Sequence, residues 1–144
     1  MKNSTNAGVI PSRILYPMVR VSDLERSLTF YVEALGMHEV RRESFTEGRF
    51  TLVFIGYGDE ASSTVLELTH NWDEGSYQHG NRYGHLAVEV ADIYGSCARL
   101  SSMGVTIKRE PGPMKFAADE SVKREVIAFI EDPDGYRIEL IERN

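Results

Sequence analysis

The sequence predicts an α+β fold built from two βαβββ units in tandem. The first observation is that Tyr16–Leu24 and His85–Ile93 have the same length and the same pattern, a strand followed by an acidic residue. The second is that a helical pattern follows each stretch. The third is that each half closes on a short apolar strand carrying one carboxylate, Glu67 or Glu139. Such self-similarity marks a repeated supersecondary unit. We therefore expect a tail at 1–12 and a single domain at 13–144, divided into repeat one (13–70), a linker (71–84) and repeat two (85–143).

The first repeat reads as a strand, a helix and three further strands. The alternating stretch Ile14–Val21 predicts the opening strand. Ser22 and Glu25 form a capping-box pattern, the apolar residues of Leu24–Leu35 recur at helical spacing, and Gly36 is the expected C-terminal cap. We expect the remaining strands at His38–Phe45, Phe50–Gly56 and Thr64–His70, with a turn at 46–48.

The second repeat follows the same order. A strand is expected at His85–Val90, a helix at Asp92–Met103 and a cap at Gly104. The later strands are expected at Val105–Lys108, Glu125–Glu131 and Tyr136–Ile141, with a strong turn signal at Asp132–Gly135. The irregular stretch Glu110–Arg124 separates two of these strands, and loops of that length often carry function or are mobile.

Composition and charge indicate a soluble globular protein and exclude several function classes. The chain has 144 residues, of which 42% are hydrophobic and 26% charged, with a net charge of -6. No run of lysine and arginine could track phosphates, so we expect no nucleic-acid partner. No apolar run approaches the roughly 18 residues of a membrane span. The polar tail lacks the apolar stretch of a secretory signal, and we expect it to be flexible.

The single cysteine, Cys97, cannot form an intramolecular disulfide, which fits a reducing cytoplasm. Because Cys97 falls inside a predicted helix, the sequence favours a small core residue over a nucleophile.

Four repeat-matched positions are the candidates for chemistry: the two glutamates and the residues that open the two repeats, Tyr16 and His85. Alternation can point a single mid-strand glutamate to solvent, so one alone would carry little meaning. All four positions converge if the two copies form facing sheets. A buried carboxylate is costly unless it is paired or bound to metal, and His with Glu suits a borderline divalent ion. The remaining histidines, His38, His70 and His79, have no matched partner and are treated as background.

The chain resembles bacterial-type glyoxalase I, a group of the vicinal-oxygen-chelate superfamily, over nearly its whole length from residue 14. The stretches that carry the resemblance are MVRVSDLERSLTFYVEALGM, FIGYGDE, LELTHNW, YGHLAVEV and IAFIEDPDGYRIELIE. The DPDGY turn is shared by much of the superfamily and supports the fold. LELTHNW together with YGH is more specific to glyoxalase I.

The resemblance implies an eight-stranded open barrel formed across a homodimer, in which each site takes one pair of residues from each chain. One divalent metal would be held by Tyr16, Glu67, His85 and Glu139; nickel is favoured, with cobalt or zinc as alternatives. The implied activity is that of a lactoylglutathione lyase. Such an enzyme isomerises the hemithioacetal of methylglyoxal and its co-substrate glutathione to S-lactoylglutathione by proton transfer through an enediolate. Glu139 is the first choice for the base, and Glu67 could serve the opposite face.

The same resemblance places Arg20, Thr69 and Asn71 where the family holds the glutathione backbone. Arginine can bind a carboxylate through two hydrogen bonds, although an ordinary ion pair on an exposed strand is equally consistent with Arg20. Arg82 and Lys123 are further cationic candidates.

Tyr16 departs from the family pattern, which has histidine or glutamine at the first ligand position. A tyrosine there could bind as phenolate, donate a hydrogen bond to a bound water, or point away. Three protein ligands with water in open positions are a common catalytic arrangement. We therefore expect a weaker or different metal preference rather than loss of the metal, with loss of activity as the alternative.

Two other functions compete with the lyase. One is a different metal-dependent isomerase, dioxygenase or thiol transferase on the same fold, since fold does not fix function. Dioxygenases and epimerases of the superfamily usually need two histidines, whereas one matched position is histidine here. The other is a metal-free binding or resistance protein, which would have no need of Glu67, His85 and Glu139.

Overall fold

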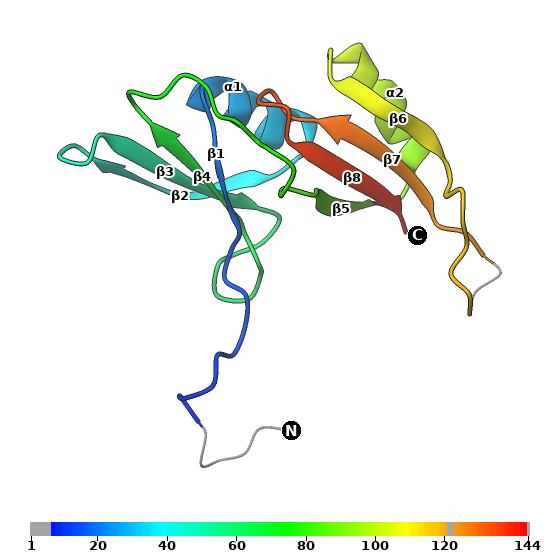
Figure 1. The fold of residues 1–144 in the computed structure, drawn as a ribbon, viewed down its shortest axis with the longest axis horizontal. Coiled ribbons are helices and arrows are strands. Elements are labelled where there is room, and N and C mark those ends of the chain that lie inside the picture. Colours follow the sequence, from blue (N-terminus) through cyan, green and yellow to red (C-terminus); the bar gives the residue numbers. More distant parts are fainter. Residues whose placement is uncertain (1–6, 121–122, 144) are drawn as a thin grey trace.

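The computed structural model describes residues 7–120 and 123–143, which form two four-stranded sheets (Figure 1). The first sheet has the order β1-β4-β3-β2 and the second the order β5-β8-β7-β6. In each sheet the first strand pairs in parallel with the last, and the other neighbours are antiparallel. The strands are β1 Met18–Arg20, β2 His38–Phe45, β3 Phe50–Gly56, β4 Leu66–Asn71, β5 Leu86–Val90, β6 Thr106–Pro113, β7 Val126–Glu131 and β8 Arg137–Glu142. The expected pair of βαβββ units is confirmed.

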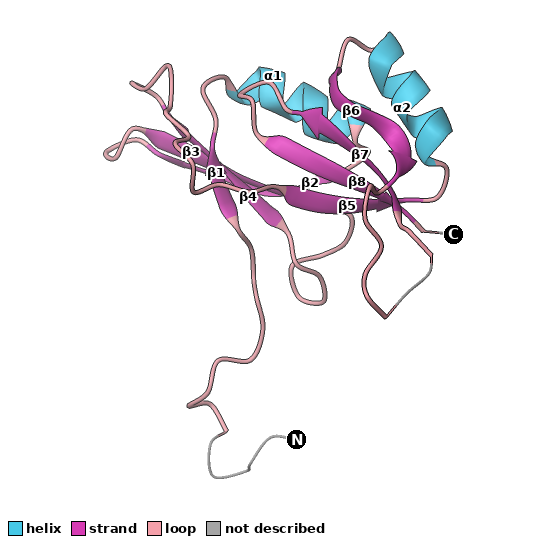
Figure 2. Cartoon of the chain, turned by 45° about the vertical axis from the view of Figure 1, so that its right-hand side comes forward, coloured by secondary structure: helices cyan, strands magenta, loops and turns pink. Residues whose placement is uncertain are grey.

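The helical segments cover one side of both sheets (Figure 2). They are α1 Leu24–Leu28, the π-helical turn η2 Thr29–Ala34 and α2 Ile93–Ser102. Apolar side chains of both repeats pack beneath them into a single buried cluster. Gly36 and Gly104 have the positive φ angles, 77° and 85°, that end a helix, as expected. The opposite face of each sheet is therefore not covered by these helical segments (Figure 2).

The capping-box expectation at Ser22 is wrong. Asp23 is the N-cap of α1, and its side chain accepts from the backbone N–H of Arg26. The Ser22 hydroxyl instead donates to Asp134 Oδ1 at 2.5 Å, in the turn between β7 and β8. The Ser22 hydroxyl therefore contacts the other repeat, although the local sequence pattern predicted that it would cap the start of the helix.

Two strand boundaries also differ from expectation. The opening strand is shorter than Ile14–Val21, because Pro17 has no backbone N–H to contribute. The Pro17 carbonyl still accepts from the backbone N–H of Glu67 at 3.0 Å, so the pairing with β4 continues before the start of β1. Strand β6 is longer than Val105–Lys108 and reaches Pro113, so the first part of the stretch expected to be irregular belongs to the sheet.

Polar contacts join the two repeats. The Tyr31 hydroxyl donates to Asp132 Oδ2 at 2.7 Å, and the Tyr136 hydroxyl donates to the Arg20 carbonyl at 2.8 Å. Arg99 on α2 donates to the carbonyls of Ala34 and Glu33 at the end of η2, at 2.8 and 2.9 Å. Burial raises the pKa of the Asp132 carboxyl above its ordinary value. The connection between repeats is therefore specific as well as apolar.

The segment before β1 is exposed, and its first described residues extend away from the rest of the domain (Figure 1). Its last residues run beside β4, where the Leu15 carbonyl accepts from the Val65 N–H at 3.2 Å. The first part of the tail predicted at 1–12 lies outside the described residues, so its flexibility stays a prediction. Within the described ranges, no helix is long and apolar enough to cross a membrane.

Candidate active site

The first repeat brings Tyr16 and Glu67 onto the sheet face away from the helices. Alternation along β4 sends Leu66 and Leu68 into the core and Glu67 to the other face. Glu67 is nevertheless only 7% exposed. Its Cα partner across the parallel pair is Met18, so Tyr16, two residues before β1 begins, lies on the same face.

The second repeat builds the equivalent pair from His85 and Glu139. Glu139 faces Ala87 in the same parallel register, with His85 at the strand entrance. His85 Nε2 lies 3.1 Å from Glu139 Oε1. Two atoms that ligate one metal ion at roughly 2.0–2.2 Å are themselves about 3 Å apart. The pair therefore fits two ligands of one divalent ion, and it equally fits an ion pair when the imidazole is protonated.

An aromatic ring accompanies each pair. Phe54 is the Cα partner of Glu67, and Phe129 is the Cα partner of Glu139. The Tyr16 ring meets Phe54 edge to face at 5.0 Å, and the His85 ring meets Phe129 edge to face at 5.3 Å. Sequence reasoning missed both phenylalanines. The signal was present, because a Phe-Ile dipeptide stands at this place in both repeats.

Each phenylalanine also has a guanidinium over its face. The Arg41 guanidinium lies 3.8 Å from the Phe54 ring centre, and that of Arg137 lies 5.6 Å from the Phe129 ring centre. Arg41 is also ion-paired with Glu60 at 2.9 Å, which helps to raise the pKa of its guanidinium. Both half-sites thus combine carboxylates with nearby positive charge.

The four matched positions come together as two pairs. Across residues 7–120 and 123–143, no three His, Cys, Asp or Glu side chains lie close enough to hold one metal ion. Glu67 is therefore not clustered with His85 and Glu139 within one chain. The structure therefore places the four positions as two pairs, and the expectation that all four converge when two sheets face each other stays a prediction.

The substrate-binding candidates occupy different surroundings. Thr69 is buried on β4, and its hydroxyl donates to Glu67 Oε2 at 2.6 Å. Arg20 is exposed at the end of β1 and is the Cα partner of Thr69. Asn71 ends β4, where its amide donates to the Tyr77 hydroxyl at 3.3 Å. Arg82 and Lys123 are exposed, in the linker and in the β6–β7 loop respectively. Arg20, Thr69 and Asn71 thus lie on the same sheet face as Glu67. The structure therefore groups three of the five substrate-binding candidates on one face.

The background histidines lie elsewhere. His70 is on the helix side of β4, where Nδ1 lies 3.3 Å from the Val21 carbonyl oxygen. His79 stacks on Tyr136 with ring centres 4.4 Å apart. His38 is exposed at the start of β2.

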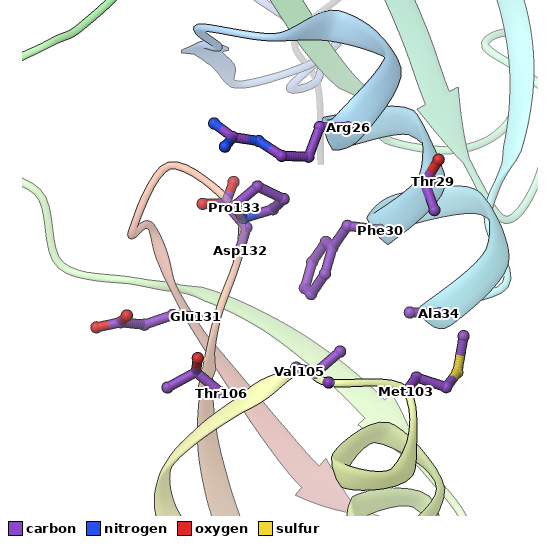
Figure 3. Close-up of a pocket in the computed structure, with 11 residues that line it drawn as sticks. Arg26, Thr29, Phe30, Ala34, Met103, Val105, Thr106, Glu131, Asp132 and Pro133 are labelled. Carbon is purple, nitrogen blue, oxygen red and sulfur yellow. The ribbon is translucent and has the colours of Figure 1, made fainter.

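A separate cavity of about 300 Å³ lies where η2 faces β6 and the turn after β7 (Figure 3). The Phe30 ring points into it from the helix, and Val105 and Met103 lie across from Phe30. None of its lining residues is one of the four matched positions. This cavity is therefore not the site described above.

Comparison with known proteins agrees with this arrangement. The model of the Glyoxalase/Bleomycin resistance protein/Dioxygenase superfamily matches residues 13–140. The chain belongs to that superfamily. Among the relatives of this chain is the lactoylglutathione lyase of Neisseria meningitidis serogroup A, which is 56% identical to it over 91% of each chain.

Two solved structures closely resemble the structure of this chain. The trypanothione-dependent glyoxalase I of Leishmania major is 42% identical, with a TM-score of 0.77, over 92% of this chain and 87% of that one. Glyoxalase I from Zea mays is 37% identical, with a TM-score of 0.83, over 91% of this chain and 44% of that longer one. The expected family and fold are confirmed.

Proposed function

We propose that the protein is a lactoylglutathione lyase, isomerising the hemithioacetal of methylglyoxal and glutathione to S-lactoylglutathione. The observation that carries the proposal is the pair of matched half-sites, Tyr16 with Glu67 and His85 with Glu139. Relatives that share 45–56% of their residues with this chain over about nine-tenths of its length are named lactoylglutathione lyase or probable lactoylglutathione lyase. The reaction moves a proton between adjacent carbon atoms, so it needs a base and a means of stabilising negative charge on oxygen.

The donor atoms fit a divalent cation. One imidazole nitrogen, two carboxylates and a phenol oxygen form a mixed set suited to a borderline or hard ion. Nickel is favoured by the family resemblance, with cobalt and zinc as alternatives. When bound, such an ion acts as a Lewis acid on the substrate oxygens and stabilises the charge that develops on them.

The two glutamates are the candidates for moving the proton. The side chain of Glu139 is 14% exposed and lies against His85, so it is within reach of a substrate on this face of the sheet. Glu139 is our first choice for the base, with Glu67 serving the opposite face of the substrate. Arg20, Asn71, Arg82 and Lys123 supply polar or cationic groups for the carboxylates of glutathione.

A homodimer would complete the site. One chain offers its ligands as two separate pairs, and each pair lies on the open face of its own sheet. A second copy related by a two-fold axis can set the first pair of one chain against the second pair of the other. Both sites of the dimer would then be identical.

The test is an activity titration of metal-stripped protein. Nickel, cobalt and zinc are added in turn, and the formation of S-lactoylglutathione is followed. We expect metal-dependent turnover, with nickel the best activator. If every metal-loaded form left the hemithioacetal unchanged, the lyase proposal would be wrong.

The alternatives are a different metal-dependent activity and a metal-free binding protein. The thiol of the substrate also has alternatives to glutathione, because the Leishmania relative is named as trypanothione-dependent. Repeating the titration with other low-molecular-weight thiols tests this. We also propose that the protein is located in the cytoplasm, where glutathione is abundant and thiols stay reduced.

A further inference from the structure

The buried carboxylate of Glu67 has a hydroxyl donor on its own strand. Thr69 Oγ1 donates to Glu67 Oε2 at 2.6 Å, and the two residues are 8% and 7% exposed. Residues two apart on a strand point to the same face, so this contact is built into the strand geometry. A carboxylate taken out of water needs such partners, because an unpaired buried charge is costly.

The backbone beneath the contact is fixed at both residues. The Glu67 N–H donates to the Pro17 carbonyl at 3.0 Å, and the Thr69 carbonyl accepts from the Val21 N–H at 2.9 Å. Across the other edge of β4, Glu67 and Thr69 pair with Phe54 and Leu52 of β3. The backbone that carries Thr69 is therefore held in place, and β-branching restricts χ1 of its side chain.

The second repeat lacks this device. The residue two positions after Glu139 is Ile141, which has no hydroxyl to donate. Ile141 is register-matched to Thr69, because Leu140 and Leu68 hold the same place in their parallel pairs with β5 and β1. The two candidate carboxylates are thus held differently, Glu67 by a hydroxyl on its own strand and Glu139 beside the His85 ring.

We propose that Thr69 is a positioning residue, which holds the Glu67 carboxylate in the orientation that binds a divalent cation. The inference rests on the proposed function and deepens it. A hydroxyl has one proton to donate and two lone pairs that accept. Since the proton is committed to Glu67, Thr69 meets the substrate only as an acceptor, from an amide N–H or an ammonium group. The carboxylates of the substrate must then be bound by other groups.

The test measures cation binding as well as turnover. Metal-stripped wild type, Thr69→Val and Thr69→Ser are titrated with Ni²⁺ in competition with a chromophoric chelator. Thr69→Val keeps the shape of the side chain and removes the hydroxyl, so we expect its dissociation constant for Ni²⁺ to rise about tenfold, as for other residues that orient a ligand. Thr69→Ser keeps the hydroxyl and should stay within about threefold of wild type.

A matched variant in the other repeat completes the design. Ile141→Thr places the same hydroxyl beside Glu139, and we expect it to leave the effect of Thr69→Val unchanged in the double variant, because the two contacts belong to different carboxylates. Thermal unfolding of each variant shows that it is folded before titration.

The outcomes separate this inference from the proposed function. If Thr69→Val bound Ni²⁺ as wild type does and only its KM rose, Thr69 would be a substrate contact and the inference would be overturned. If wild type bound Ni²⁺ and showed the Thr69 dependence but left the hemithioacetal unchanged, the positioning role would stand and the lyase proposal would fall. Wild type that bound none of Ni²⁺, Co²⁺ and Zn²⁺ would overturn both.

Discussion

Tyr16 is the residue that sets this chain apart from the pattern of its family. Its ring lies edge to face with Phe54, the Cα partner of Glu67, so it is on the same face as that carboxylate. A phenol has to lose its proton to bind a cation, whereas a neutral imidazole does not. At neutral pH a tyrosine at this position is therefore expected to bind a cation more weakly than a histidine would.

The first prediction concerns the phenol oxygen. Tyr16→His should lower the dissociation constant for Ni²⁺ at pH 7 by about tenfold, because nitrogen donors suit this ion and carry no proton to displace. Tyr16→Phe, which keeps the ring contact with Phe54, should raise it. Chelator competition measures both. A Tyr16→Phe variant with the dissociation constant of wild type would show that the phenol oxygen is not a ligand.

At the scale of elements, strands β3 and β7 carry the rings that pack edge to face against Tyr16 and His85. We expect Phe129→Leu to free the His85 imidazole and lower kcat/KM about tenfold, since a ligand loses metal affinity and activity when its supporting contact is removed. The stability cost should be about 1 kcal/mol, the usual cost of such a change in a packed ring.

The control for this prediction lies on the neighbouring sheet. Phe50 on β3 stacks on Phe45 at 4.7 Å, whereas the described rings of Tyr16 and His85 pack on Phe54 and Phe129. Phe50→Leu should cost similar stability and leave kcat/KM unchanged. Equal losses of activity in the two variants would mean that Phe129 acts through general packing.

The elements also show where sequence reasoning succeeds and where it stops. Strands β2 and β3 match the predicted His38–Phe45 and Phe50–Gly56, because a turn separates two clear β patterns. The role of Ser22 was missed, because its partner Asp134 is remote in sequence. The matched glutamates could be found from the repeat alone. The Thr69 contact with Glu67 needed the side-chain geometry, since the sequence does not say where a hydroxyl points.

For the whole molecule, the joint between the repeats should make stability depend on pH. Burial raises the pKa of Asp132, so the folded protein binds that proton more tightly than the unfolded chain does. This contribution is complete below the ordinary carboxyl pKa of about 3.9 and is lost as the pH rises through the raised pKa of the folded state.

Asp132→Asn tests this dependence, because its amide stays neutral and can still pair with the Tyr31 hydroxyl. We expect the free energy of unfolding of wild type to fall relative to that of Asp132→Asn as the pH rises above 4. Urea unfolding at a series of pH values measures the difference. Parallel curves for the two proteins would contradict a raised pKa at Asp132.

In the proposed homodimer, each site should contain Glu67 of one chain and Glu139 of the other. Glu67→Gln and Glu139→Gln should each be nearly inactive as homodimers, because every site contains one altered carboxylate. In a mixed dimer the site that takes Glu67 from one chain and Glu139 from the other is either doubly altered or fully intact. Unfolding and refolding an equal mixture should therefore restore about one quarter of the wild-type rate, since about half the dimers are mixed and each has one intact site of two. Sites assembled within single chains would give no recovery on mixing, which makes the recovered rate a direct measure of how the half-sites meet.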